Sequence, residues 1–409
     1  MSRRRAVPSL ELGSAGAAFG LAGGGARFLF AVPPLAGHVN PTVAVGAELT
    51  RRGHKVAWAG HASTVRPLLE RSAKVYDTED EDFARRLDAA RDRSRGLRGP
   101  AAFRFLWEEF IVPLGHAMMP GVRAAIEDFR PHVVIADQQV LAAPVVARRR
   151  GIPWATSATT SAELARPLAA FPKVERWVAD LIEGFQREHG DTDPMDLRFS
   201  DHLVLVFSTP ALVRDAELFP GHYAFVGPAL GRPSRGTFPW QWLDPTRRAV
   251  LVSLSSINAA AGGRFFREAA EAVADLDLQA VFVAPQDAVP APPPNVLVRR
   301  QVPQLSLLPR LSAVVSHGGH NTVCETLAHG LPLVVAPIRD DQPVVARQVA
   351  DAGAGIVVPF ARVRAEDLRA AITAVLTEDS YRDAARAVQE SFAAAGGAER
   401  AAERLEKLA

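Results

Sequence analysis

The sequence has almost no cysteine, and this scarcity limits the sites that the chain can build. Cys324 is the single cysteine among 409 residues. An internal disulfide framework and a metal site made of several cysteines are therefore excluded. Cys324 falls on the apolar side of a predicted helix, and we expect its thiol to pack in a core.

Long apolar runs and an excess of one charge are also missing. No run approaches the roughly 20 residues that a membrane-spanning helix needs. The formal charge is only +2, from 47 basic and 45 acidic residues, and because the two signs are interspersed we expect no nucleic-acid partner. Hydrophobic residues make up 48% and charged residues 22% of the chain, which is typical of a globular protein. We expect a cytoplasmic enzyme.

Residues 1–26 contain arginines followed by a weakly apolar stretch that resembles a signal peptide. Glu11 and many glycines interrupt this stretch, and it runs directly into a predicted strand. We therefore expect a flexible extension, or a start of translation set too early, rather than a cleaved leader.

The length and the order of elements predict two α/β domains. A chain of 409 residues exceeds what one core usually serves, so two domains of about 200 residues each are expected. Strand-like runs alternate with helical patterns in both halves, which is typical of doubly wound parallel sheets that bind ligands beyond their C-terminal strand ends. The expected segments are a first domain at 27–230, a linker at 231–247, a second domain at 248–396 and a last helix at 397–409.

The most informative stretch is 316–342, SHGGHNTVCETLAHGLPLVVAPIRDDQ. Its His-Gly-Gly is preceded by a strand-like run and followed by a helical pattern, so these three residues lie on a strand-to-helix turn. Free N–H groups at the start of a helix stabilise an anionic pyrophosphate, and Gly318 and Gly319 allow it to approach the backbone. Donors and acceptors suited to phosphate oxygens and ribose hydroxyls are His317, Asn321, Thr322 and Glu325.

This stretch resembles the donor-binding signature of the GT-B glycosyltransferases, nucleotide-sugar-dependent enzymes that glycosylate lipophilic natural products in plants and bacteria. The match begins at VPQLSLLPRLSAVVSHGG and closes at DDQ. The resemblance implies two Rossmann-like domains that face a central cleft, with the last helix packed back on the first domain. It also implies a donor site. In that site the diphosphate is held by His317, Asn321, Thr322 and Ser256, and the ribose is held by Glu325. The hexose is held by Asp341 and Gln342, and the base is held by Gln301 (Trp in many members), Val302 and Gln304.

The first loop, PPLAGHVNP at 33–41, carries the candidate catalytic base. A hydroxyl is a weak nucleophile while it keeps its proton, so transfer to an alcohol needs a base. His38 precedes a helix expected near Pro41, and Asp137 ends a later strand at the same sheet edge. Asp137 can fix the tautomer of His38 and stabilise its imidazolium. The resemblance implies the same two residues.

Two aromatic insertions interrupt the first domain, and apolar helices inserted between the strands of such a domain can line an acceptor cleft. The alternative is that each ring is simply core. The candidate acceptor residues are Phe103, Phe105, Trp107, Phe110, Phe171 and Trp177.

The candidate base and donor groups predict an inverting, metal-independent transfer of a hexose to a hydroxyl. The resemblance implies that the acceptor is a lipophilic natural product such as a polyketide, macrolide, ansamycin or phenol. UDP-glucose is the preferred donor, a dTDP-deoxysugar is the alternative, and no further cofactor is expected. Antibiotic biosynthesis and inactivation would use the same chemistry. We expect a monomer or a homodimer.

Three other classes of protein differ from the predicted glycosyltransferase in particular features. A catalytically silent GT-B protein that activates a partner would have no use for His38, Asp137 and the donor motif together. A nucleotide-sugar epimerase would release an altered free sugar without an acceptor. A nicotinamide dehydrogenase is improbable because PPLAGHVNP replaces the G-x-G-x-x-G turn after the first strand.

Overall fold

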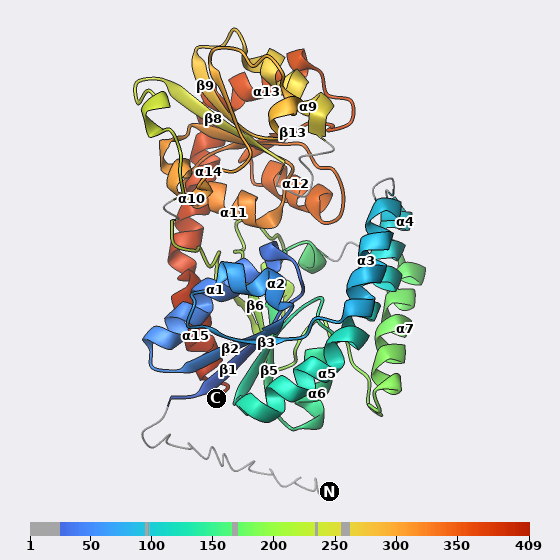
Figure 1. Cartoon of the computed structure of the whole chain (residues 1–409). Helices are drawn as coiled ribbons and strands as arrows, with labels where there is room; N and C mark the ends of the chain where they lie inside the picture. The colour runs from blue at the N-terminus through green and yellow to red at the C-terminus, as the bar shows by residue number, and fades with distance from the viewer. Residues whose placement is uncertain (1–24, 95–96, 98, 166–170, 234–235, 255–261) are drawn as a thin grey trace, which may run out of the picture.

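Two parallel sheets organise the chain, one in each half (Figure 1). The computed structural model describes residues 25–94, 97, 99–165, 171–233, 236–254 and 262–409. Both sheets carry helices on their two faces, which is the doubly wound arrangement that the alternation of elements predicts. The predicted fold class, α/β with two Rossmann-like domains, is confirmed.

The first sheet has the strand order β3-β2-β1-β4-β5-β6-β7, with its strands parallel. The chain order reverses between β1 and β4, which makes a crevice at their carboxyl ends where ligands bind in such sheets. The strands are β1 (Arg27–Ala31), β2 (Lys55–Gly60), β3 (Lys74–Asp77), β4 (Val133–Asp137), β5 (Trp154–Ala158), β6 (Leu203–Val206) and β7 (Tyr223–Phe225).

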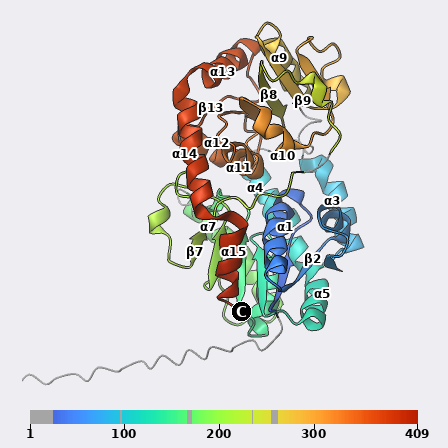
Figure 2. The same cartoon turned by 90° about the vertical axis from the view of Figure 1, so that its left-hand side faces the viewer.

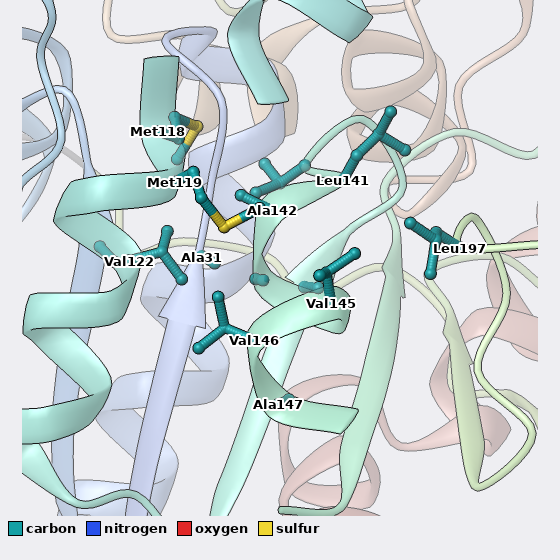
Figure 3. Packing of buried hydrophobic residues seen from close by; sticks show 14 of the residues in the cluster. Ala31, Met118, Met119, Val122, Leu141, Ala142, Val145, Val146, Ala147 and Leu197 are labelled. Carbon is teal, nitrogen blue, oxygen red and sulfur yellow. The ribbon is translucent and has the colours of Figure 1, made fainter. Parts of the chain in front are cut away.

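Alternate residues of β1 enter two different cores. Leu29 and Ala31 face one core together with α5 and α6, part of which Figure 3 shows. Phe28 and Phe30 face the other core, with α1 and α15. Since both faces are covered, these strands are apolar throughout. The helices of this half are α1 (Ala36–Arg51), α2 (Ala62–Val65), η1 (Arg66–Leu68), α3 (Glu81–Ser94), α4 (Gly99–Phe105), the π-helical η2 (Leu106–Ile111), α5 (Val112–Phe129), α6 (Ala142–Arg149), η3 (Glu163–Ala165), α7 (Pro172–Glu188), η4 (Ala216–Leu218) and η5 (Trp240–Trp242).

The second sheet has the order β10-β9-β8-β11-β12-β13, again parallel, and reverses between β8 and β11. Its strands are β8 (Arg248–Ser253), β9 (Leu278–Val283), β10 (Val296–Arg299), β11 (Ala313–Ser316), β12 (Leu333–Val335) and β13 (Gly355–Val357). Its helices are α9 (Gly263–Val273), η7 (Gln286–Ala288), α10 (Gln304–Leu307), η8 (Leu308–Arg310), α11 (His320–Leu327), α12 (Gln342–Asp351), α13 (Ala365–Thr377) and α14 (Asp379–Ala395). The last helix of the chain is α15 (Gly397–Glu406).

The chain returns to the first domain through a sharp turn between α14 and α15. Gly396 and Gly397 have φ values of 87° and 56°, in the left-handed region that glycine adopts at little cost. The Gly397 N–H donates to Val226 O at 2.7 Å. Helix α15 then lies beside α1, and Ala401, Ala402 and Leu405 are buried in the core that contains Phe28 (Figure 2).

One local feature differs from the sequence-based expectation. Helix α1 begins at Ala36, so His38 lies in its first turn rather than in a loop before Pro41. Pro41 has no N–H to donate to Gly37 O, and this carbonyl accepts from Asn321 Nδ2 instead.

Candidate active site between the two domains

His38 and Asp137 lie together at the reversal point of the first sheet. Strand β1 leads through Pro33 and Pro34 into α1, and Asp137 is the last residue of β4. Because parallel strands end at the same edge, the two side chains meet there. His38 Nδ1 lies 3.1 Å from Asp137 Oδ1 and 3.0 Å from Asp137 Oδ2.

Burial of the carboxylate determines how this pair behaves. The Asp137 side chain is 0% exposed and that of His38 is 18% exposed. The N–H of Gln139 also donates to Asp137 Oδ1 at 2.9 Å. With Asp137 ionised, His38 Nδ1 carries the proton, so Nε2 on the opposite side of the ring holds the lone pair that can accept a proton.

The protonation of His38 depends on two opposing effects. Desolvation by burial lowers the pKa of His38, but the charges of Asp137 and Asp341 and the hydrogen bond to Asp137 outweigh it, and the pKa lies above its ordinary value. The imidazolium is therefore stabilised where it would form during proton transfer.

This raised pKa predicts the pH dependence of any reaction that uses His38 as a base. Only the neutral ring accepts a proton, so kcat/KM should fall as the pH drops through an apparent pKa above 6.5. Asp341→Asn removes one negative charge and should move this acidic limb to lower pH. A pH–rate profile with the limb below 6.5 in the unchanged protein would contradict this assignment.

The glycine turn of the second domain follows β11. Gly318 has a φ of 87°, and a Cβ on it would lie 2.8 Å from Val335 Cγ1. Gly319 is the N-terminal cap of α11, so the free N–H groups of the helix begin here. Burial lowers the pKa of His317 to about 4, and at neutral pH its ring is an uncharged hydrogen-bond donor rather than a cation.

Replacing Gly319 with alanine should displace His317 without straining the backbone. Gly319 has a φ of −62°, but a Cβ would lie 2.6 Å from His317 Nε2. If His317 binds the diphosphate, we expect UDP binding to weaken about tenfold, as for one lost charge-assisted hydrogen bond. Calorimetry and thermal unfolding would measure this, with Gly184→Ala, which meets nothing within 4 Å, as the matched control. Unchanged UDP binding in Gly319→Ala would contradict the role of His317.

The candidate ribose and base residues lie next to one another. Gln304 Nε2 donates to Glu325 Oε2 at 2.6 Å. Burial raises the pKa of Glu325, and this hydrogen bond offsets part of the rise. Val302, two residues before Gln304, is partly buried, while Gln301 is exposed.

The remaining donor candidates lie where the domains meet. Asn321 Nδ2 donates across the interface to Gly37 O at 2.7 Å, one residue before His38. Thr322 is partly buried. Asp341 Oδ2 accepts from Thr160 Oγ1 of the first domain at 2.7 Å. Asn321 and Asp341 thus contact the first domain beside His38 and beside the end of β5.

Two further candidate donor residues are Gln342 and Ser256. Gln342 is buried, and its Oε1 accepts from the N–H groups of Ile338 and Arg339 at 2.9 and 3.2 Å. Its oxygen therefore shapes the loop before α12, which leaves Nε2 for a ligand. Ser256 lies outside the described residues.

The six candidate acceptor aromatics divide into groups. Trp107 and Phe110 are 2% and 7% exposed within the core of the first domain, so packing explains these two. Phe103 and Trp177 are partly buried, with ring centroids 6.2 Å apart, Phe105 is partly buried, and Phe171 is 61% exposed. Acceptor contact by these last four residues stays a prediction.

Several residues at this site were not singled out from the sequence. Thr159, Thr160 and Ser161 follow β5 and contact His38, Asp341 and His320. The available signal was their position, since β5 ends at the same sheet edge as β4. Among the described residues, no group of three or more His, Cys, Asp or Glu side chains is arranged to hold a metal ion, and no helix is long and apolar enough to cross a membrane.

Two facing Rossmann-like domains of this kind define the GT-B class of glycosyltransferases, and solved members match the whole fold. The glycosyltransferase of kitacinnamycin covers 94% of this chain and 99% of its own, with a TM-score of 0.76 and 26% identity. The calicheamicin glycosyltransferase CalG4 covers 94% and 98%, with a TM-score of 0.74 and 25% identity.

Sequence comparison gives the family. Residues 267–408 match the model of the erythromycin biosynthesis protein CIII-like C-terminal domain. The chain is 31% identical to 4'-demethylrebeccamycin synthase of Lentzea aerocolonigenes, over 90% of this chain and 96% of that protein. It is 30% identical to demethyllactenocin mycarosyltransferase of Streptomyces fradiae, over 94% and 86%. The chain therefore belongs to the family of GT-B natural-product glycosyltransferases, whose members use nucleotide-sugar donors and small-molecule acceptors.

Proposed function

We propose that this glycosyltransferase moves a hexose from a nucleotide sugar to a hydroxyl of a lipophilic natural product, with inversion at the anomeric carbon. The observation that carries the proposal is the hydrogen bond from Asn321 Nδ2 to Gly37 O at 2.7 Å. This hydrogen bond places the first turn of α11 in contact with Gly37, the residue before His38. A sugar held at that turn would have its anomeric carbon close to the candidate base.

In the proposed reaction, His38 Nε2 takes the proton of the acceptor hydroxyl as its oxygen attacks the anomeric carbon. The bond from that carbon to the diphosphate oxygen breaks on the opposite face, which inverts the configuration. Asp137 stabilises the imidazolium that results. His317 and the free N–H groups of α11 stabilise the negative charge on the departing diphosphate, so the scheme needs no metal ion.

UDP-glucose is the donor that we propose. Asp341 and Gln342 offer polar groups for several sugar hydroxyls, and buried polar groups left unpaired by a deoxysugar would cost affinity. A relative that is 28% identical over 91% of the chain is named as an uncharacterized UDP-glucosyltransferase of Bacillus subtilis. The acceptor is proposed at the level of class, as a hydroxylated polyketide, macrolide, ansamycin or phenol.

Mass spectrometry of reaction mixtures would test the proposal. The purified protein is incubated with UDP-glucose or dTDP-glucose and a panel of lipophilic phenols and polyketides. A product heavier by one hexose with UDP-glucose supports both the reaction and the donor. If the same product forms only with dTDP-glucose, the proposed donor changes from UDP-glucose to the dTDP sugar. Tight UDP binding without any product would favour a silent binding protein over the proposed enzyme.

A further inference from the structure

Consecutive hydroxyl side chains after β5 contact three separate parts of the site. Thr159 Oγ1 lies 2.8 Å from His38 Nδ1 and donates to Asp137 Oδ2 at 2.9 Å. Thr159 is 4% exposed, so water does not compete freely for these bonds. Thr159 thus closes a ring of hydrogen bonds with the candidate base and its carboxylate.

The hydroxyl can make both contacts only in one arrangement of protons. Its single proton is donated to Asp137, so its oxygen must accept the proton of His38 Nδ1. The carboxylate alone leaves the ring poorly fixed, because Nδ1 lies at almost equal distances, 3.1 and 3.0 Å, from both Asp137 oxygens. The additional acceptor fixes the ring plane, while Asp137 keeps the proton on Nδ1 and the lone pair on Nε2.

We propose that Thr159 is a positioning residue for the glycosyl-transfer reaction, completing a His38–Asp137–Thr159 set that holds the base in its reactive orientation. The proposal rests on the proposed function only in assigning His38 as the base. Thr159 does not touch the substrate in this scheme. It acts through the imidazole and the carboxylate.

The next two residues tie this set to the donor domain. Thr160 Oγ1 donates to Asp341 Oδ2 at 2.7 Å, and Ser161 Oγ donates to Gln348 Oε1 at 2.6 Å. Ser161 Oγ also lies 3.3 Å from His320 Nδ1 of α11. Thr159 itself hydrogen-bonds within the first domain, and the two residues that follow it contact the donor domain. The His38–Asp137–Thr159 set therefore lies directly at the domain interface.

Charged and titratable groups from several elements face His38. Their charges determine how the pKa of His38 responds when the Thr159 hydroxyl is removed. They are Asp137 at the end of β4, Asp341 before α12 and His320 in α11. The Thr159 hydroxyl disperses part of the Asp137 charge. Without it, the carboxylate attracts the imidazolium more strongly, so the pKa of His38 should rise.

Thr159→Val and Thr159→Ser separate the hydroxyl from the shape of the side chain. We expect Thr159→Val to lower kcat about ten- to a hundredfold, as for one lost charge-assisted hydrogen bond. The donor KM should stay within about twofold, and the acidic limb of the pH–rate profile should move up by about half a unit. Thr159→Ser should restore kcat and the limb. A Thr159→Val enzyme with unchanged kcat and limb, or a serine variant as impaired as the valine variant, would overturn the proposal.

The neighbouring residue provides a matched variant. Thr160→Val also removes one hydroxyl, but from Asp341 rather than from the base. It should change the donor KM and leave the position of the acidic limb in place, provided that the folded state is retained by circular dichroism. A shift of the limb as large as that of Thr159→Val would assign both effects to disturbance of the segment and overturn the proposal.

A measurement without substrate keeps this inference separate from the proposed function. Imidazole nitrogen NMR of the free protein across a pH series, with the His38 signals assigned by comparison with His38→Ala, reports the tautomer and the pKa of His38 directly. Because Asp137 stays in place, we expect protonated Nδ1 in every variant, and a His38 pKa about half a unit higher in Thr159→Val than in the unchanged protein and in Thr159→Ser. Identical titration curves would overturn the positioning role even if glycosyl transfer is observed. The expected difference would support it even if every acceptor fails.

Discussion

Replacing His38 with alanine should lower glycosyl transfer by about 100- to 10,000-fold, which is the usual contribution of general-base catalysis. Binding of UDP should stay within about twofold, because the candidate pyrophosphate turn at Gly318 and Gly319 belongs to the other domain. Single-turnover measurement of product and calorimetry of UDP binding would test the two halves of this prediction.

The chain contains a suitable control for this substitution. His202 forms an ion pair with Asp201 at 3.0 Å, but both side chains are exposed, at 45% and 69%. His202→Ala should leave transfer unchanged, because this pair lies in solvent. Retention of more than about a tenth of the activity by His38→Ala would exclude it as the main base.

Replacing Asp137 with asparagine should reduce kcat by about 1,000- to 10,000-fold, although the side chain keeps its shape. The buried carboxylate accepts from Thr159 Oγ1 at 2.9 Å and faces His38 Nδ1 at 3.0 Å. An amide nitrogen at either position offers a donor where an acceptor is required. The imidazole would then turn to its other tautomer and lose the lone pair on Nε2.

Two further observations would distinguish this loss from unfolding. Thermal unfolding should show a modest decrease in stability, because a buried donor is left unpaired. Asp201→Asn changes the exposed pair in the same way, and we expect no effect on kcat. A kcat for Asp137→Asn within about tenfold of the unchanged protein would show that Asp137 does not fix the tautomer.

The sequence predicts the sheet edges of this site well, because strand ends in parallel sheets are set by local patterns. His38 and Asp137 each follow an apolar run, and parallel pairing of β1 with β4 brings the ends of these runs together. Glycines at 318 and 319 also predict the strand-to-helix turn after β11 locally. Such features need no knowledge of how the domains meet.

Contacts across the domain interface could not be predicted in the same way. Asn321 bonds to Gly37, and Thr160 bonds to Asp341, 181 residues away in sequence. Neither pairing follows from the hydrophobic periodicity or from a motif, since both depend on how the two sheets are oriented relative to each other. The side chain of Gln342 illustrates a further limit, because its oxygen bonds to backbone that only the folded loop brings near.

Burial distinguishes aromatic residues that the sequence alone does not distinguish. The sequence marks Trp107 and Phe171 equally as aromatic side chains in inserted helices. In the fold, Trp107 is 2% exposed and Phe171 is 61% exposed. The difference comes from the packing of α5 and η2 on the first sheet, which no single-residue property encodes.

The return of α15 to the first domain has a consequence for biosynthesis. Ala401, Ala402 and Leu405 complete a core whose other members include Phe28 and Leu203. The ribosome makes the whole second domain before it makes these residues, since translation runs from the N-terminus. A nascent first domain therefore keeps an uncovered apolar face on its sheet throughout synthesis of the second. Its folding becomes complete only after the segment 397–406 has emerged, which makes that interval the one in which chaperone binding or aggregation competes most strongly with folding.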